Sequence, residues 1–530
     1  MNTRAADCVW TRRAFLLIAL SWQVAAALHP ADWILERLTV DDTFLLLRSI
    51  QGWAEHGVPT FDGIHRTNGF QALWAIVLLP LAACFPQPEL LLRATLLLAA
   101  VVNTATGVVL CRWSAVRLRD PRMALWVAAI WCGYCVAARP AMIGLENCLL
   151  GLLAAIAVTI VGDPKSPTLL GTIARAAVCS AMIWTRLDAL LIAAPLWLAT
   201  LRAGRRAIPA FALGGLILAS GTIGLMTFNN WAGGSWTPVS GMVKRAIAAQ
   251  IEPHWSIGVV GEALIDSVRQ GTKALTIGVG NIWPPALSTA TRIIAPMLMI
   301  IAAWRQRVPS AGWVGLWLIA CTAHILGIRL WLGEYHADAL WYYSVEGVLG
   351  VVAFTWAAAR LTGAGRSGAA LAIGVGVIKL PIALLSLFLP PLHETVDSNR
   401  LAAARWIREN VPPNERLASW NAGELAFFSQ RTIINLDGLV NDRAYFALLH
   451  AGRAGAEYLR ENDVRWVVDY ASGTADEQAA LWGWLRRDDW TLAARFGGRD
   501  ELAQVIYRRV ATGHSSAATS APTKATPEAE

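Results

Sequence analysis

The stretch from Ile208 to Phe228 reads IPAFALGGLILASGTIGLMTF and contains no charged side chain. Because about 20 consecutive apolar residues allow an α-helix to cross a bilayer, this stretch predicts a transmembrane helix. Hydrophobic residues make up 55% of the 530-residue chain and charged residues only 15%, whereas soluble proteins carry about 25% charged residues. The composition therefore excludes a disordered chain, a coiled coil, a small disulfide scaffold and an ordinary soluble enzyme. It indicates a polytopic α-helical membrane protein.

Other apolar runs of this kind are candidate spans along most of the chain. With the first stretch they are Ala14–Leu28, Phe70–Phe85, Leu90–Leu110, Met123–Ala138, Met142–Val161, Leu169–Trp184, Leu187–Leu201, Ile208–Phe228, Ile293–Trp304, Gly312–Leu332, Trp341–Ala359 and Ala369–Leu389. The first run follows Arg12 and Arg13 and resembles a signal peptide. Because so many spans follow it, we interpret it as an uncleaved signal anchor.

The positions of the Arg-rich segments test this set of spans. If all the runs cross, the four Arg-rich segments fall outside the membrane, against the usual cytoplasmic bias of Lys and Arg. They are Arg112–Arg122, Arg202–Arg206, Arg305–Arg307 and Arg360–Arg366. If the short run Phe70–Phe85 does not cross, all four fall inside, together with Arg12 and Arg13. We therefore expect about 11 spans and a cytoplasmic N-terminus.

The domain division follows from this topology and from a change in composition. We expect a transmembrane module over residues 1–392, with outside loops at 30–69 and 229–289. Residues 393–510 are charged throughout and predict a small extracytoplasmic α/β domain. Its expected helices are Arg400–Asn410, Arg443–Glu461 and Asp476–Arg487, and its expected strands are Leu417–Trp420, Thr432–Leu436, Val464–Tyr470 and Ala503–Tyr507. The Ala/Ser/Thr/Pro-rich tail, 511–530, predicts disorder.

Several kinds of site and partner are disfavoured. The net charge of +8 comes largely from Arg residues in short gaps between apolar runs, so we expect no nucleic-acid partner. The eight cysteines lie in or beside apolar segments, which disfavours a disulfide framework. No cluster has zinc-ligand spacing, and the sequence leaves a divalent cation open.

Polar residues gather at the side of the membrane opposite the Arg-rich segments. Asp41 and Asp42 precede an amphipathic stretch, Phe44–His56, that suits the membrane surface. Further candidates at this side are Arg66, Arg139, Glu146, Arg186, Asp188, Lys244, His336, Tyr342 and Tyr343. Ionisable groups in or beside spans are costly and so indicate function. Helix capping is the alternative for the acidic pair, and snorkelling is the alternative for the single cations.

An ordered series of short segments resembles a bacterial branch of the GT-C integral-membrane glycosyltransferases, a class that includes the protein O-mannosyltransferases and the lipid A aminoarabinose transferases. The segments are Asp41–Phe44, Gly57–Gly63, Thr67–Trp74, Gly144–Asn147, Thr185–Ala189, Pro238–Lys244, Trp341–Tyr343 and Asn435–Asn441. The series runs from the first outside loop into the C-terminal domain. Gln71 and Ala72 depart from the His-Pro expected before Leu73 and Trp74, which removes an expected kink and polar contact.

The resemblance implies a catalytic acidic residue in the first outside loop and a donor sugar on a polyprenyl phosphate or pyrophosphate. By position we expect Asp41 to be the base, with Asp42 orienting it or an acceptor hydroxyl. For the donor phosphate we expect Arg186 and Lys244, with Arg139 and Arg66 behind them. The other partners expected are a lipid or glycan acceptor and membrane lipids.

Two other functions fit the same composition. One is a transporter or flippase for a lipid-linked sugar, although the apolar spans lack the matched halves typical of transporters. The other is a non-catalytic accessory protein with a GT-C-like fold. A membrane glycosyltransferase with its site on the outer face is the function that the sequence favours.

Overall fold

The computed structural model describes residues 3–118, 121–137, 142–161, 168–198, 201, 208–251, 260–265, 319–331, 340–361, 387–388, 396–471, 485, 489–497 and 503–510. Outside these residues lie the expected span Ile293–Trp304 and nearly all of Ala369–Leu389. The expected helix Asp476–Arg487, apart from Leu485, and the tail 511–530 also lie outside them.

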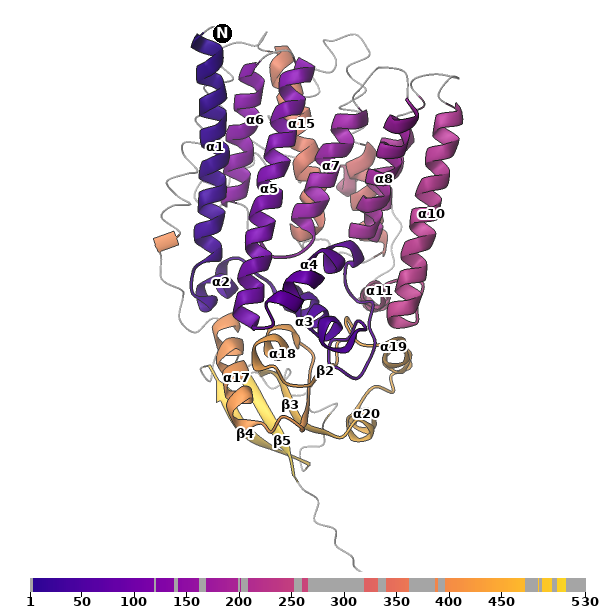
Figure 1. Ribbon diagram of the computed structural model, residues 1–530. Helices are drawn as coiled ribbons and strands as arrows, with labels where there is room; N and C mark the ends of the chain where they lie inside the picture. Colours follow the sequence, from indigo (N-terminus) through magenta and orange to yellow (C-terminus); the bar gives the residue numbers. More distant parts are fainter. Residues whose placement is uncertain are drawn as a thin grey trace, which may run out of the picture.

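Apolar helices form a bundle with the C-terminal domain at one end and the N-terminus at the other (Figure 1). The helices before the C-terminal domain are α1 (Thr3–Ala27), α2 (Ala31–Arg37), α3 (Asp41–His56), α4 (Ala72–Cys84), α5 (Pro88–Leu118), α6 (Pro121–Ala137), α7 (Asn147–Val161), α8 (Leu169–Thr185), η2 (Leu187–Ala189), α9 (Leu190–Leu198), α10 (Ile208–Gly233), α11 (Val239–Ile251), an unlabelled helix at Ile319–Trp331, η5 (Leu340–Tyr343) and α15 (Ser344–Leu361).

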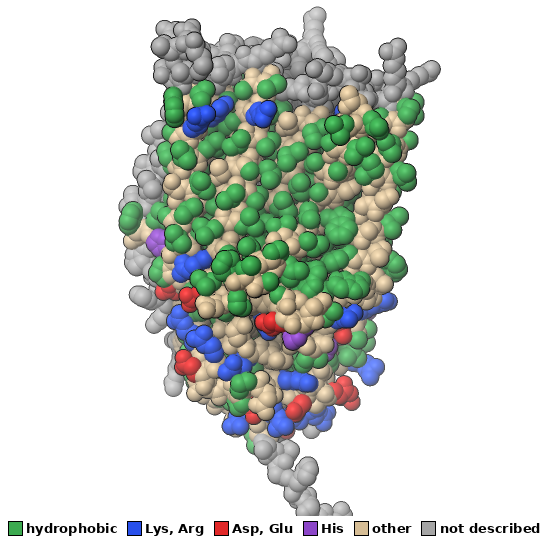
Figure 2. All heavy atoms as spheres, viewed as in Figure 1, with side chains coloured by type: hydrophobic (Ala, Val, Ile, Leu, Met, Phe, Trp, Pro, Cys, Tyr) green, Lys and Arg blue, Asp and Glu red, His purple; other side chains and the backbone are tan. Residues whose placement is uncertain are grey.

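The outer surface of the bundle suits a membrane. Hydrophobic side chains cover the middle of the face in Figure 2, and charged side chains gather toward the C-terminal domain. Among the described residues, α10 and the Pro88–Val116 part of α5 are each long and apolar enough to cross a bilayer. The pair Val9–Ala27 and Ala31–Arg37, bent by 119°, passes the same test as a unit.

The segment that we expected not to cross forms α4, at the end of the bundle beside the C-terminal domain (Figure 1). This helix has 13 residues, so it is only about 20 Å long at 1.5 Å per residue, against about 30 Å of hydrocarbon. The demotion of Phe70–Phe85 and the total of about 11 spans both stay predictions.

Helix α3 lies between the bundle and the C-terminal domain. It is buried from Thr43 to Gly52, and the Phe44 ring lies 5.4 Å from the rings of both Phe427 and Phe428. The apolar face of the amphipathic stretch is therefore covered by protein, and not by lipid as its pattern suggested. Because α3 starts at Asp41, this packing brings the acidic pair to the junction of the two domains.

The C-terminal domain is a mixed five-stranded sheet with helices. Its elements are α17 (Val396–Asn410), β1 (Arg416–Ser419), α18 (Gly423–Ser429), β2 (Ile433–Asn435), α19 (Arg443–His450), α20 (Ala456–Glu461), β3 (Val464–Ala471), β4 (Trp490–Phe496) and β5 (Ala503–Arg509). The strand order is β2-β1-β3-β5-β4. Strand β1 is parallel to β2 and β3, while β5 is antiparallel to β3 and β4.

Four of these strands coincide with the four expected from the sequence. The structure adds α18 and the edge strand β4, and it divides the expected helix Arg443–Glu461 into α19 and α20. Gly452 lies between these two helices with φ +66°, a left-handed conformation that ends α19 because few side chains tolerate it.

Two glycines allow the C-terminal domain to approach the membrane module closely. A Cβ atom at Gly69 would lie 1.8 Å from the Leu439 carbonyl oxygen, and one at Gly423 would lie 2.5 Å from the Asp41 carbonyl oxygen. Neither position has room for a larger residue unless the backbone moves. The two modules therefore share a tight junction at which the functional candidates meet.

Candidate functional site

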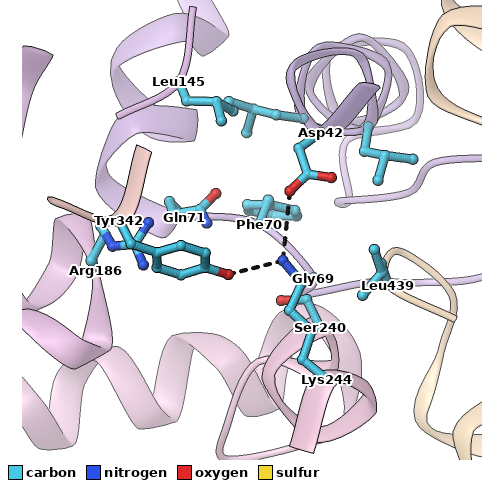
Figure 3. A pocket seen from close by; sticks show the side chains of 12 residues that line it. Asp42, Gly69, Phe70, Gln71, Leu145, Arg186, Ser240, Lys244, Tyr342 and Leu439 are labelled. Carbon is cyan, nitrogen blue, oxygen red and sulfur yellow. Dashed lines mark hydrogen bonds and ion pairs between the residues drawn. The ribbon is translucent and has the colours of Figure 1, made fainter. Parts of the chain in front are cut away.

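A small cavity of about 40 Å³ lies at this junction. Figure 3 shows that side chains from widely separated segments face it. Its polar lining comes from Asp42, Gln71, Arg186, Ser240, Lys244 and Tyr342, and its apolar lining from Leu45, Leu46, Phe70, Leu145 and Leu439, with Gly69. Leu439 belongs to the C-terminal domain, so both modules build the cavity.

Lys244 joins the acidic pair to the rest of the site. Its Nζ atom lies 3.6 Å from Oδ2 of Asp42 and donates a hydrogen bond of 3.0 Å to the Tyr342 hydroxyl. Burial lowers the pKa of this ammonium, but Asp42 and Tyr342 outweigh that effect and raise the pKa above its ordinary value. Lys244 is therefore a permanent cation at neutral pH.

Arg186 is the second cation of the cavity, and two carboxylates hold it. Its Nη1 donates to Glu146 Oε1 at 2.7 Å, while Nε and Nη2 donate to the two oxygens of Asp188 at 3.0 and 2.6 Å. The guanidinium carbon lies 4.3 Å from the centre of the Tyr342 ring. A guanidinium held on its edge and on its face has a fixed orientation.

Local structure explains how these side chains come together. The chain leaves α8 at Arg186 in an extended conformation, and the 3-10 turn Leu187–Ala189 directs Asp188 back to the guanidinium. Glu146 stands directly before α7, after a turn at Gly144 with φ +83°. Trp74 donates to the carbonyl of Gly144 at 3.0 Å, so α4 fixes this turn.

Asn68 positions the helix that carries Lys244. Its side-chain amide donates to the carbonyls of Asn229 and Ser235 at 3.0 Å each, and its Oδ1 accepts the N–H of Val239 at 2.9 Å. Val239 is the first residue of α11. The amide therefore connects the end of α10 to the start of α11 and sets where Lys244 lies.

Asp41 and Asp42 have different partners although they are neighbours. Asp41 accepts the N–H groups of Gly423 and Glu424, at 3.3 and 2.9 Å, and its Oδ1 lies 3.8 Å from Arg400. It therefore binds the first turn of α18 in the C-terminal domain, whereas Asp42 lines the cavity. This geometry favours Asp42, and not Asp41 as we expected, for chemistry in the cavity.

The other predicted residues divide into three groups. Glu146 and Asp188 hold Arg186, and Tyr342 lines the cavity. Tyr343 packs in a small apolar cluster with Ala263, Ile325 and Ile328, while Arg66 lines a separate open hollow with His65, Trp231 and Arg443. Arg139 and His336 lie outside the described residues.

Four residues near the site were not among the predicted site residues, although the sequence placed Glu346 among the polar residues at span ends. Gln71 and Ser240 line the cavity, but uncharged side chains within recognised segments gave no separate signal. His324 and Glu346 lie behind Asp188 and are fully buried. An ionisable residue inside an apolar run such as His324 was the available signal for this pair.

A protein-family model and solved structures of other proteins are similar to this chain. A family model described as a domain of unknown function, DUF8728, matches residues 393–516. The structure of ArnT from Cupriavidus metallidurans bound to undecaprenyl phosphate is similar to this chain, with a TM-score of 0.60 and 14% identity over 94% of this chain and 98% of that one. The apo structure of the same protein gives a TM-score of 0.53 with 14% identity, over 96% and 99%.

This chain has the GT-C fold. The likeness covers nearly the whole of both chains, so it includes the helix bundle and the C-terminal domain. No curated protein matches the chain in sequence. At 14% identity the likeness defines the fold, and the roles of individual residues must be argued from their own contacts.

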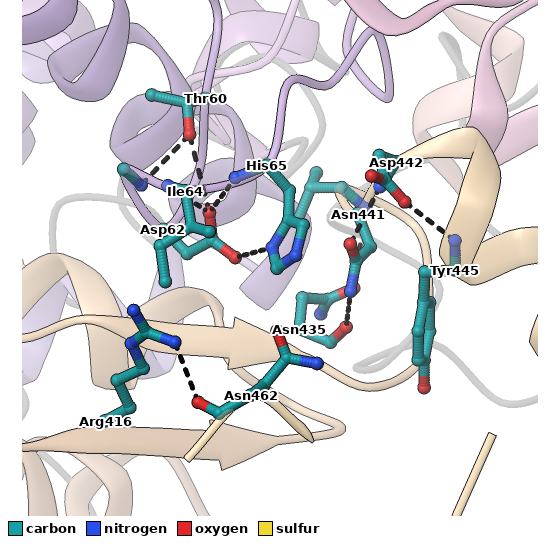
Figure 4. A network of polar contacts seen from close by, with 12 residues as sticks. Thr60, Asp62, Ile64, His65, Arg416, Asn435, Asn441, Asp442, Tyr445 and Asn462 are labelled. Carbon is teal, nitrogen blue, oxygen red and sulfur yellow. Dashed lines mark hydrogen bonds and ion pairs between the residues drawn. The ribbon is translucent and has the colours of Figure 1, made fainter. Parts of the chain in front are cut away.

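The loop between α3 and α4 is itself ordered by an Asp–His pair (Figure 4). Asp62 accepts the backbone N–H groups of Ile64 and His65 at 2.8 Å, and it lies 2.7 Å from Nδ1 of His65. Burial lowers the pKa of His65, but Asp62 and Asp442 outweigh it and raise the pKa above its usual value. The loop that carries Gly69 to the cavity is therefore held in one conformation.

Two carboxyl groups of the C-terminal domain sit in unfavourable surroundings for a charge. Burial, with a smaller effect of Asp41, raises the pKa of Asp469 to about 7. Burial, with Asp41 and Asp42 adding to it, raises the pKa of Asp437 to about 8. Because each group is protonated more readily in the folded than in the unfolded chain, folding is favoured at low pH. That contribution is complete below about pH 4 and is lost as the pH rises to about 7–8.

We expect Asp469→Asn to stabilise the protein by about 2–4 kcal/mol at pH 8 and by less than half of that at pH 5, where most of the contribution of the protonated carboxyl is still present. Asn remains able to accept the 3.2 Å hydrogen bond from Asn421 without carrying a charge. Thermal unfolding of the purified full chain at both pH values measures this. The matched control is Asp463→Asn, at an exposed position of the same domain, which should change neither value. An equal effect of Asp469→Asn at pH 5 and pH 8 would contradict the prediction.

Proposed function

We propose that this protein is a membrane glycosyltransferase that moves a sugar from a polyprenyl-phosphate donor to an acceptor hydroxyl on the outer face of a bacterial inner membrane. One observation carries the proposal. A carboxylate, Asp42, and two cations, Lys244 and Arg186, line one cavity at the end of the helix bundle. The related fold of ArnT has been solved with undecaprenyl phosphate bound, which supports a lipid phosphate as the ligand of these cations.

In the proposed reaction, the acceptor oxygen attacks the anomeric carbon of the donor sugar. The bond between that carbon and the phosphate oxygen breaks, and its electron pair leaves with the polyprenyl phosphate. Asp42, which lines the cavity beside Lys244, takes the proton of the acceptor hydroxyl as the general base. Lys244 and Arg186 stabilise the negative charge that develops on the departing phosphate.

Asp41 has a supporting role in this proposal. By binding the first turn of α18 it fixes the start of α3 against the C-terminal domain, and it thereby holds Asp42 at the cavity. Within the described residues no group of three His, Cys, Asp or Glu side chains is arranged to hold a metal ion. We therefore assign no step of the proposed sugar transfer to a divalent cation.

The outer-face location gives a topology prediction. Reporters fused after Arg119, Arg205 and Arg366 should read cytoplasmic, and reporters fused after Trp255 and Tyr470 should read outside, because Lys and Arg favour the cytoplasmic side. The N-terminus and the C-terminal domain lie at opposite ends of the bundle (Figure 1). A cytoplasmic reading at Tyr470 would move the cavity away from the outer face and contradict this part of the proposal.

Photocrosslinking tests the ligand of the cavity. A photoreactive undecaprenyl phosphate should label peptides of α3 and α11, which carry Asp42 and Lys244. Excess undecaprenyl phosphate should suppress the labelling, and undecaprenol, which lacks the phosphate, should not. Labelling that undecaprenol suppresses equally well would show that the cavity does not recognise a phosphate.

A further inference from the structure

A histidine that does not line the cavity connects to it through buried charges. His324 lies in the helix Ile319–Trp331 and is fully buried. Its Nδ1 atom is in direct contact with Oε1 of Glu346 on α15, and its Nε2 atom lies 3.5 Å from Oδ2 of Asp188. Because Asp188 holds Arg186, a continuous series runs from Glu346 through His324 and Asp188 to Arg186.

The donor groups of Arg186 show what this series does for the cavity. A guanidinium has five N–H bonds, and the carboxylates of Glu146 and Asp188 take three of them. Two N–H bonds are then available to a phosphate in the cavity that Arg186 lines. Asp188 binds the Nε and Nη2 edge with both oxygens, so the orientation of Asp188 decides which N–H bonds stay available.

Asp188 stands on a three-residue turn and is 22% exposed as a side chain, so the turn alone leaves its carboxylate freedom to rotate. His324 removes this freedom by an ion pair with Oδ2, the oxygen that also accepts from Nη2 of Arg186. Glu346 fixes the imidazole in turn, in the way that a carboxylate orients a histidine in many sites. The Tyr343 ring packs edge-on against the imidazole of His324, with the two ring centroids 6.5 Å apart.

We propose that His324, held by Glu346, is a positioning residue for the phosphate site: it orients Asp188 so that Arg186 presents its two remaining N–H bonds to the donor phosphate. This inference rests on the proposed function, because it assumes that the cavity binds a lipid phosphate. His324 contacts neither the cavity nor the reacting atoms, and it acts through Asp188 and Arg186.

A double-mutant cycle tests the inference on the purified full chain in lipid nanodiscs. The probes are undecaprenyl phosphate and undecaprenol, and the variants are His324→Gln, Arg186→Lys and the two combined. His324→Gln should weaken the binding of undecaprenyl phosphate about tenfold and leave the binding of undecaprenol unchanged. In the Arg186→Lys background the same change should have no further effect, because the guanidinium through which His324 acts is absent.

Controls separate positioning from a general loss of structure. Glu346→Gln keeps the shape of the side chain and should weaken undecaprenyl phosphate binding in the same direction, by less than His324→Gln. His450→Gln, at an exposed position of α19, should leave both affinities unchanged. A loss of undecaprenol binding in His324→Gln equal to its loss of undecaprenyl phosphate binding would show a merely structural residue and overturn the inference.

The remaining outcomes distinguish the inference from the proposed function. If the wild-type protein prefers undecaprenyl phosphate over undecaprenol, and the effects of His324→Gln and Arg186→Lys simply add, the phosphate site stands and the positioning role is refuted. If the wild-type protein shows no preference for the phosphate, the proposed function itself fails, and the positioning role fails with it.

Discussion

Asp42→Asn should lower the rate of sugar transfer by about 10²–10⁴-fold, the range expected when a positioned base is removed. The substitution keeps the size and hydrogen-bonding capacity of the side chain and removes its basic site. The Asp42 side chain is 31% exposed, so we expect expression and thermal stability near those of the wild type. The measurement is the release of polyprenyl phosphate from its sugar-linked form by the purified protein in the presence of acceptor.

Asp41→Asn is the matched control, because it makes the same chemical change one residue earlier. An Asn side chain still accepts hydrogen bonds at the start of α18, so this variant should retain most of its transfer rate. It should lose some thermal stability, since the charge facing Arg400 is gone. A greater loss of transfer in Asp41→Asn than in Asp42→Asn would return the role of base to Asp41.

Lys244→Gln should weaken the binding of undecaprenyl phosphate by about 10–100-fold, which corresponds to the loss of about 1.5–3 kcal/mol for a hydrogen bond to a charged group. Lys244 is the cation that faces Asp42, so its removal should also leave the Asp42 carboxylate less firmly positioned. Equilibrium binding of labelled undecaprenyl phosphate to the full chain in nanodiscs measures the first effect.

Arg245→Gln is the control, because Arg245 follows Lys244 on α11 but lies over the Trp331 ring at 4.0 Å. It should bind undecaprenyl phosphate as the wild type does. Equal losses in the two variants would indicate a general attraction of the basic helix for the lipid, and would contradict a defined phosphate site.

Arg186→Gln is a less informative variant of the phosphate site than the sequence suggested. A place at a span end predicts a variant that stays monodisperse in detergent. The guanidinium is nearly buried and neutralises two carboxylates, so its removal leaves charges without a partner, at a cost of about 3–5 kcal/mol. Arg186→Lys, which keeps the charge, is the variant that reports on binding.

Charge clustering at one interface, together with the resemblance, pointed to Arg186 and Lys244, with Arg139 and Arg66 behind them. The structure brings Arg186 and Lys244 to one cavity with Asp42 and places Arg66 in a separate hollow. The sequence was not sufficient to choose between Asp41 and Asp42. Adjacent residues of a helix point about 100° apart, and which of them faces the cavity depends on where α18 packs.

The elements that the sequence missed also depend on packing against distant parts of the chain. Strand β4 is an edge strand whose residues after Trp490 are largely exposed, so it lacks the alternating pattern that marks a half-buried strand. Helix α18 has only seven residues, all buried, and a run this short has no helical period to detect. The role of His324 depends on contacts with helices far away in the sequence, which no local pattern encodes.

Native mass spectrometry of the protein purified with its own lipids tests the central claim most directly. We expect a bound species whose fragments give a polyprenyl phosphate and a sugar, present in the wild type and in Asp42→Asn, and depleted in Lys244→Gln. The retained donor in Asp42→Asn would separate binding from transfer. A protein that carries only phospholipids, or that retains the same lipid in Lys244→Gln as in the wild type, would contradict the account.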